Sequence, residues 1–316
     1  MIETISGLMT LSEKLLCKRE VLGKSFETTI SGIKANVFFP VCPPVNTDDF
    51  ASFKVGMNNP LQAPKGGGTW KCDDWGYIVQ MPTCSCVVNH LTLSVACEEE
   101  QVMSVAETLY KSIEKWEKAF QDYIRIATKQ NTQRKTDYLK KTCSLELKTK
   151  EHIRGTGSAC LHITVTPLDY YAASKQIENA ARFAGSEKEL FSDYQMLLAA
   201  YDARRIDQNR HAIVNATSAL EKCIVTFLEN ELAGQYSDVG AFLEKKHRKL
   251  GERIQLAKDL DTTFPDIDFQ TKVLGPRNDL AHNREFYPTN DTTEEHIKCV
   301  EICLEHFHAG KFYEGE

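Results

Sequence analysis

The chain has 316 residues, a formal net charge of −6, 42% hydrophobic residues and 26% charged residues. These proportions are near the average for globular proteins, so they exclude a disordered chain, a collagen-like fibre and a small disulfide scaffold. The sequence contains no run of about 18 apolar residues, which a membrane span needs. Glu3 precedes the first lysine and no continuous apolar stretch follows, so no secretory signal is indicated. We expect a cytoplasmic protein of about two domains with no membrane partner.

The charge is distributed unevenly along the chain. Residues 186–316 contain 16 Lys and Arg against 24 Asp and Glu, whereas residues 1–185 contain 22 against 20. The second part is therefore strongly acidic and the first part slightly basic, which indicates a composition boundary near Gly185. We predict two domains, residues 1–185 and residues 186–316.

Residues 1–185 show both strand and helix patterns. The predicted strands cover residues 26–39, 77–81, 90–96, 143–148 and 159–166. Between them, apolar residues recur with helical period over residues 98–128. These patterns predict a mixed α+β domain. Its residues indicate no particular chemistry, and we expect it to recognise a trigger, a partner or RNA.

Residues 186–316 show helical periodicity almost throughout. The predicted helices cover residues 186–205, 207–232, 239–260, 269–286 and 292–307. Residues that commonly cap helix N-termini stand at four of these starts: Ser186, Asp207, Asp238 and Thr292. Helices with short connections predict a compact bundle. The expected fold class is α+β, with a mixed α+β domain followed by an all-α bundle.

The cysteine pattern argues against a structural zinc site. The chain has 11 cysteines but no CxxC pair, and zinc ribbons and fingers need paired ligands at short spacing. Cys299 and Cys303 lie one helical turn apart among aliphatic residues, which favours core packing. His306 and His308 are two residues apart on the last predicted helix and therefore diverge. We expect no metal site and no cofactor.

One constellation of polar residues stands out near the end of the predicted bundle, the sequence RNDLAH at residues 277–282. An arginine separated from a histidine by four residues, with a polar residue directly after the arginine, resembles the signature of the HEPN (higher eukaryotes and prokaryotes nucleotide-binding) family. Residues 207–232 and 292–307 are similar to two helices of that family's bundle. The resemblance covers about residues 186–308. Residues 1–185 lie outside it.

The same loose pattern occurs a second time in the chain. Arg205 and His211 also have a fitting spacing, but Arg205 is followed by Ile206 and the pair spans a predicted helix boundary. The position of the 277–282 motif within the bundle and its polar residue after the arginine distinguish it from this chance match.

Helix geometry gives the motif a partial physical account. Asn278 and His282 are four residues apart and share a helix face, whereas Arg277 and His282 are five apart, about 140° around the axis. A long arginine side chain can reach round to the shared face. Pro276 suits the first turn of a helix, so we expect a helix to begin there with free backbone N–H groups that attract phosphate.

The resemblance implies a metal-independent endoribonuclease that acts on single-stranded RNA. In such chemistry a ribose 2′-hydroxyl attacks the adjacent phosphate and leaves a 2′,3′-cyclic phosphate end. Arg277 would hold the phosphodiester, Asn278 would belong to the same catalytic set, and His282 would transfer protons. The resemblance also implies a homodimer whose two motifs face one cleft. The implied role is that of a toxin or antiviral-defence effector in abortive infection, with an antitoxin or defence-system partner.

Other residues receive secondary assignments. Glu221 and Asp279 are candidates to support the site, and each also fits an ordinary cap or salt bridge. Basic side chains bind phosphates, so two basic segments are candidate RNA contacts, although a solvated helix face or loop explains them equally well. Their residues are Lys245, Lys246, Arg248 and Lys249 in the bundle, and Arg134, Lys135, Lys140 and Lys141 in the first domain.

Two alternatives to a ribonuclease stay open at this stage. The chain could be a non-catalytic HEPN-like sensor or adaptor that binds a nucleotide through the same residues. It could also be a structural interaction protein, in which Arg277 and Asn278 only cap or pair and His282 is an ordinary surface residue.

Overall fold

The computed structural model describes residues 1–40, 70–72, 78–80, 85–130, 132, 144–148, 153–154, 170–282 and 285–316. The chain divides into two compact units. Unit 1 comprises Met1–Asn131 and Leu139–Lys188, and unit 2 comprises Thr132–Tyr138 and Glu189–Glu316. The main division, between residues 188 and 189, lies close to the predicted boundary after residue 185. The fold class is α+β, as the sequence predicted, because strands and helices build unit 1 and helices build the described part of unit 2.

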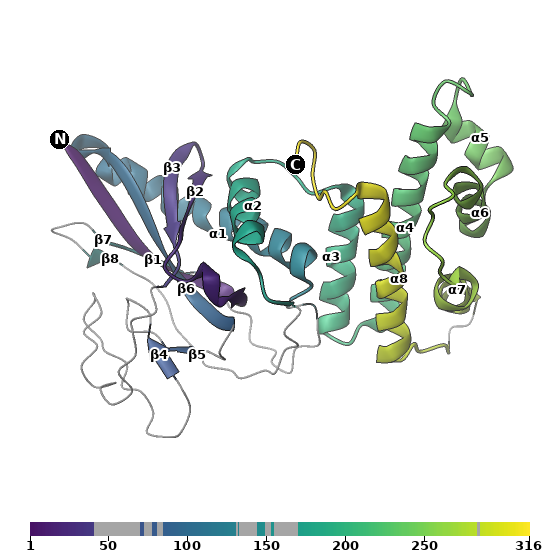
Figure 1. Cartoon of the computed structure of the whole chain (residues 1–316), viewed down its shortest axis with the longest axis horizontal. Helices are drawn as coiled ribbons and strands as arrows, with labels where there is room; N and C mark the ends of the chain where they lie inside the picture. The colour runs from purple at the N-terminus through teal and green to yellow at the C-terminus, as the bar shows by residue number, and fades with distance from the viewer. Residues whose placement is uncertain are drawn as a thin grey trace. The chain divides into compact units, whose positions relative to one another are not determined.

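An antiparallel sheet forms the framework of unit 1 (Figure 1). Its strands are β1 (Ile2–Lys18), β2 (Ser25–Ile30), β3 (Ile33–Phe38), β6 (Ser85–Glu98), β7 (Ser144–Lys148) and β8 (Ile153–Arg154). They lie in the order β2-β3-β6-β1-β7-β8, and β4 (Trp70–Cys72) pairs separately with β5 (Ile78–Gln80). Ser31 and Gly32 join β2 to β3 with φ angles of 48° and 81°. Two successive positive φ angles are typical of a tight two-residue hairpin.

The sequence pattern missed β1, the longest strand of this sheet. The pairing of β1 with β6 changes register between Thr10 and Leu15. A register shift of this kind changes which residues face each side of the sheet. Strict alternation of apolar and polar residues is therefore lost along β1, although Met9 and Leu15 are fully buried.

Two helices pack with the sheet of unit 1. They are α1 (Val102–Thr128), which confirms the helix predicted over residues 98–128, and α2 (Ser174–Gly185). The indole N–H of Trp116 on α1 donates to Thr28 Oγ1 on β2 at 2.8 Å, and that hydroxyl donates to the Ala181 carbonyl on α2 at 2.7 Å. Thr28 thus joins both helices to the sheet. The strand predicted over residues 159–166 lies outside the described residues.

Unit 2 is built around helices that lie side by side. Its helices are α3 (Ser192–Arg205), α4 (Asn209–Glu231), α5 (Val239–Lys246), α6 (Leu250–Leu260), α7 (Gly275–His282) and α8 (Asn290–His308). Figure 1 shows α3, α4 and α8 alongside one another, and each contacts the other two. Both α6 and α7 pack on α4. No helix in the described parts of the chain is long and apolar enough to cross a membrane.

Three of the four predicted N-terminal caps do not cap the helix that each was expected to start. Asp238 caps α5 as predicted, since its Oδ1 accepts the N–H of Ala241 at 2.8 Å. Ser186 instead ends α2, because its N–H and hydroxyl both bond to the Phe183 carbonyl. Asp207 has a left-handed φ of 59° and ends the α3 turn, and Thr289 rather than Thr292 caps α8. Cap residues also satisfy the ends of preceding helices, so residue type alone does not decide the role.

The helix predicted over residues 239–260 is two helices, α5 and α6. The N–H of Lys249 bonds to Glu252 Oε2 at 3.1 Å and starts α6. Arg253 Nε–H donates to the His247 carbonyl at 2.9 Å. Side chains therefore form the hydrogen bonds that these backbone groups lose at the break between the helices. The apolar period continues across the break, which explains why the sequence pattern did not reveal it.

Candidate functional site

The predicted motif lies on α7, which continues a π-helical turn over Gln270–Leu274. Asp268 starts this combined helix, because its Oδ1 accepts the N–H of Thr271 at 3.1 Å. The N–H of Gly275 bonds to the Gln270 carbonyl, and Pro276 has no N–H. The predicted helix start at Pro276, with free N–H groups beside the motif, is therefore wrong. The motif lies in the last two turns of a longer helix.

Pro276 gives a physical reason for the π turn. A regular α-helix would pair the Lys272 carbonyl with the N–H four residues later, which proline lacks. His296 on α8 takes that place, with its Nδ1 3.1 Å from the Lys272 oxygen. Its Nε2 lies 3.1 Å from Thr217 Oγ1 on α4. Because a carbonyl oxygen only accepts, Nδ1 carries the ring proton.

His296 is the buried support of the helix that carries the motif. The side chain has 0% exposure, and burial lowers the pKa of its imidazole to about 4, because burial disfavours the charged form. The imidazole is therefore neutral near pH 7. At the surface, Lys272 Nζ also bonds to Glu295 Oε1 at 2.8 Å. A neutral hydrogen bond and a surface ion pair thus hold this helix to α8.

The motif side chains Arg277, Asn278, Asp279 and His282 are all exposed. Arg277 Nη1–H donates to Asn278 Oδ1 at 3.3 Å, which turns the guanidinium toward the face that Asn278 shares with His282. In the described part of the chain, Arg277 forms no ion pair with a carboxylate. The arrangement presents a guanidinium, an amide and an imidazole to solvent from one short helix. Those groups can bind a phosphate and exchange a proton.

The chain after the motif is fixed to the start of α4. Asn209 Nδ2–H donates to the Pro288 carbonyl at 3.1 Å, and Arg210 donates to the Phe286 carbonyl. The Arg210 guanidinium carbon lies 5.7 Å from the centre of the Tyr287 ring, which is 76% exposed. An exposed aromatic ring beside a cation is suited to stacking a base and contacting a phosphate. Sequence reasoning missed this pair because its members are far apart in the chain.

The candidate supporting residues differ in their surroundings. Glu221 Oε1 accepts from Arg253 Nη1 at 2.8 Å, and the Arg253 guanidinium also lies 3.3 Å from Glu244 Oε1. Glu221 therefore ties α4 to α6, and no described bond joins it to the motif. Asp279 is exposed on α7, and its carboxylate has no hydrogen bond or ion pair among the described residues.

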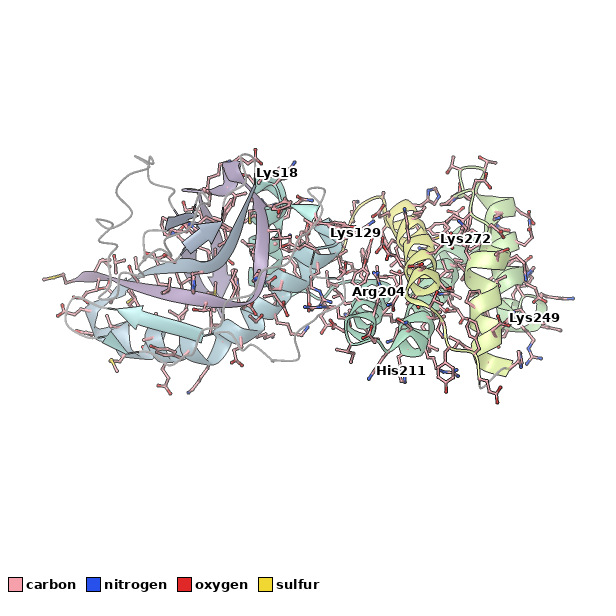
Figure 2. The ribbon with its side chains drawn as sticks, turned by 90° about the horizontal axis from the view of Figure 1, so that it is seen from below. Lys18, Lys129, Arg204, His211, Lys249 and Lys272 are labelled. Atoms are coloured by element: carbon pink, nitrogen blue, oxygen red, sulfur yellow. The ribbon has the colours of Figure 1, made fainter. Side chains whose placement is uncertain are left out.

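The basic residues of the bundle gather where α5 ends and α6 begins. Lys245, Lys246, Arg248 and Lys249 are all exposed, and we call them the α5–α6 basic cluster. Figure 2 shows Lys249 at the surface. They surround a helix break rather than line one continuous helix face. The other candidate RNA contacts, Arg134, Lys135, Lys140 and Lys141, lie outside the described residues.

The second arginine–histidine match does not form a comparable surface. Arg205 is the last residue of α3 and is buried, with Nη1 3.9 Å from Asp202 Oδ1. His211 is exposed on α4 (Figure 2). The two residues lie on different helices with opposite burial, whereas Arg277 and His282 share one exposed helix.

A further polar cluster was not predicted. Asp193 on α3, Cys223 on α4 and His308 on α8 bring one potential ligand atom each to within 4.8 Å of one another. The three residues are far apart in sequence and have no metal-ligand spacing, so no sequence signal pointed to them. His306, as expected, diverges from His308 and bonds to Asp261 Oδ2 at 2.6 Å.

No family model matches this chain, and no curated protein or solved structure shows significant similarity to it.

Proposed function

We propose that the chain is a metal-independent endoribonuclease of the HEPN type that cleaves single-stranded RNA. The observation that supports this most directly is the exposed group Arg277, Asn278 and His282 on α7, with the guanidinium bonded to Asn278 on the shared face. The helical unit that carries the motif is consistent with a HEPN-like bundle. The π turn directly before the motif adds support, because π turns within helices are frequent at functional sites.

The chemistry follows from the groups on α7. Arg277 donates to the non-bridging oxygens of a phosphodiester and stabilises the charge that builds there. An imidazole of His282 removes the proton of the ribose 2′-hydroxyl, whose oxygen attacks the phosphorus. The bond from phosphorus to the 5′-oxygen breaks, and a second imidazole protonates that oxygen. The products are a 2′,3′-cyclic phosphate and a 5′-hydroxyl, with no metal ion in the reaction.

This reaction needs an acid and a base, and one α7 offers a single motif histidine. A homodimer with two α7 helices facing one cleft supplies both, and the exposure of the motif leaves its face open to a second copy. Because a mixed dimer of wild-type and His282→Ala chains keeps only one imidazole, activity in such mixtures is expected to fall with the square of the wild-type fraction. A fall that is only linear, in mixtures that contain mixed dimers, would contradict a shared cleft.

RNA binding is proposed to involve the α5–α6 basic cluster, since residues 186–316 are acidic overall. Neutralising phosphates releases counterions, so affinity should fall steeply with salt. The double variant Lys245→Glu/Lys249→Glu is expected to weaken RNA binding and reduce its salt dependence in fluorescence anisotropy. The matched control Lys222→Glu/Lys298→Glu changes the same charge at exposed sites on α4 and α8. Equal losses in both variants would show a nonspecific effect of net charge.

The proposed setting is the cytoplasm, where the protein would act as a toxin or antiviral-defence effector in abortive infection. An antitoxin or defence-system partner would restrain it, and unit 1 would recognise a trigger, a partner or the RNA. Expression of wild type is then expected to halt growth, and Arg277→Ala is expected to relieve the arrest. Equal toxicity of both proteins at equal abundance would contradict this role.

Cleavage of an unstructured RNA by the purified full chain tests the activity. The reaction is run without added metal ions and with a chelator. Arg277→Ala is expected to lower the rate by about 10²-fold or more, a loss typical for removing one donor to developing charge. A strict need for added magnesium would contradict the mechanism. Nucleotide binding without turnover would instead support the sensor or adaptor.

A further inference from the structure

Three polar side chains from three helices meet inside unit 2. Asp193 is the second residue of α3, Cys223 lies within α4, and His308 is the last residue of α8. Asp193 and Cys223 are 3% and 2% exposed, and the His308 side chain is 15% exposed. The His308 Nε2 lies 2.7 Å from Asp193 Oδ2. The cluster is therefore almost enclosed, and His308 is its most exposed member.

The cluster is not arranged as a cysteine nucleophile with its base. Asp193 contacts both other members, as it bonds to His308 and to the Cys223 thiol. Burial, followed by the charge of Asp193, raises the pKa of the Cys223 thiol. A nucleophilic cysteine needs a lowered pKa and a histidine beside its sulfur. What the three residues share is that each offers a donor atom that transition metals bind.

The donor atoms fit one ion in both type and distance. Zinc binds carboxylate oxygen, imidazole nitrogen and thiolate sulfur at about 2.0–2.3 Å, which places tetrahedral ligand atoms roughly 3.5 Å apart. The three atoms here lie within 4.8 Å of one another. The His308 ring stacks on Phe191, with centroids 4.6 Å apart and planes 11° apart, so its orientation is already set. Small side-chain shifts would place all three atoms around an ion.

Tyr194 supplies an independent indication. Its hydroxyl is buried and has no hydrogen-bond partner among the described residues. The Tyr194 ring centre lies 5.2 Å from that of His308. Buried hydroxyls without partners are uncommon, and this one belongs to a ring that packs beside the ring of a proposed ligand.

We propose that Asp193, Cys223 and His308 bind one zinc-like divalent metal ion through a carboxylate oxygen, a thiolate sulfur and an imidazole nitrogen. Water occupies the fourth position. The ion replaces the Cys223 thiol proton, which leaves to solvent. It also takes the place of the proton on His308 Nε2, and the neutral imidazole then carries its one proton on Nδ1. The ion joins α3, α4 and α8 inside unit 2. This proposal does not depend on the ribonuclease activity of α7.

Cobalt(II) is the probe that tests this site in the full chain. The metal-stripped protein is titrated with Co²⁺, and a thiolate-to-cobalt charge-transfer band is expected to saturate at one ion per chain. Zn²⁺ is expected to displace Co²⁺ and to raise the melting temperature, because it binds the folded state. Metal affinity is expected to increase with pH, since the thiol must lose its proton.

Two variants and a matched control decide the assignment. Cys223→Ser is expected to abolish the band, whereas Cys299→Ser, a buried cysteine on α8, is expected to keep it. His308→Gln changes a partly exposed side chain and therefore tests the site even if Cys223→Ser fails to fold. It is expected to weaken Co²⁺ binding at least about tenfold, since losing even an outer partner of a ligand costs about 10–100-fold. The absence of a thiolate band in wild type, or an unchanged Co²⁺ affinity in His308→Gln, would overturn the proposal.

Discussion

His296 is expected to make the folding of unit 2 sensitive to acid. Burial lowers its pKa from 6.5 to about 4 in the folded protein. Between these pH values the unfolded chain binds a proton that the folded chain does not, so the free energy of unfolding falls as pH decreases. One pKa unit corresponds to about 1.4 kcal/mol, which gives a loss of about 3 kcal/mol across the whole interval. This loss is complete below pH 4 and absent above pH 6.5.

His296→Asn isolates this effect, because asparagine does not titrate and keeps a side-chain N–H close to the Nδ1 position. The variant loses ring volume and is expected to be about 1–3 kcal/mol less stable than wild type at pH 7. Its deficit should then shrink toward acid pH. His90 in unit 1 also has a pKa lowered to about 4 by burial, and it contributes equally to both proteins. The difference between wild type and variant therefore reports His296 alone.

The assay must separate the two units. All 3 tryptophans lie within residues 70–116, so their fluorescence follows unit 1. Urea-dependent hydrogen exchange of peptides from α8, read by mass spectrometry, follows unit 2. The stability of α8 in wild type should fall with acid more steeply than in His296→Asn. If the stability of α8 fell equally with acid in the two proteins, this would refute the neutral, buried state of His296 and its support of the helix that carries the motif.

Two further variants test packing in each unit. Gly185→Ala should destabilise unit 1 by about 1–3 kcal/mol in urea unfolding, because the added Cβ would lie 2.6 Å from the Thr29 backbone nitrogen. An unchanged urea midpoint of unfolding would show that α2 does not pack closely on β2 at this position. Arg253→Met should destabilise unit 2 by about 1–3 kcal/mol, chiefly because the His247 carbonyl loses its donor at the break between α5 and α6. The exposed partner carboxylates contribute little. Stability equal to wild type in hydrogen exchange of α6 would contradict that role.

The sequence revealed elements whose signal is local and periodic. The helix α1 was predicted because its apolar residues recur every turn over a long segment. The strand β1 was not, because its register shift removes the alternation that identifies a strand. The division into a mixed unit and a helical unit followed from charge and periodicity. The caps of α3, α4 and α8 could not be predicted in this way, because they depend on the hydrogen-bond partner of each side chain.

The candidate site shows the same limit. The motif on α7 could be found because Arg277, Asn278 and His282 are close in sequence. Its exposure and its position beyond a π turn could not be predicted. They depend on the Lys272 carbonyl, which lacks an N–H partner at Pro276 and bonds instead to His296 of another helix. The Asp193, Cys223 and His308 cluster draws on three helices, and only the fold brings it together.

The most direct test of the proposed ribonuclease compares two single histidine variants. His282→Ala and His211→Ala each remove one exposed imidazole from unit 2, but only His282 belongs to the motif. Cleavage of single-stranded RNA is measured with wild type and both variants, and the product ends are identified. We predict 2′,3′-cyclic phosphate and 5′-hydroxyl ends from wild type and His211→Ala, and no cleavage by His282→Ala. Undiminished cleavage by His282→Ala, or its loss in His211→Ala alone, would contradict the proposal.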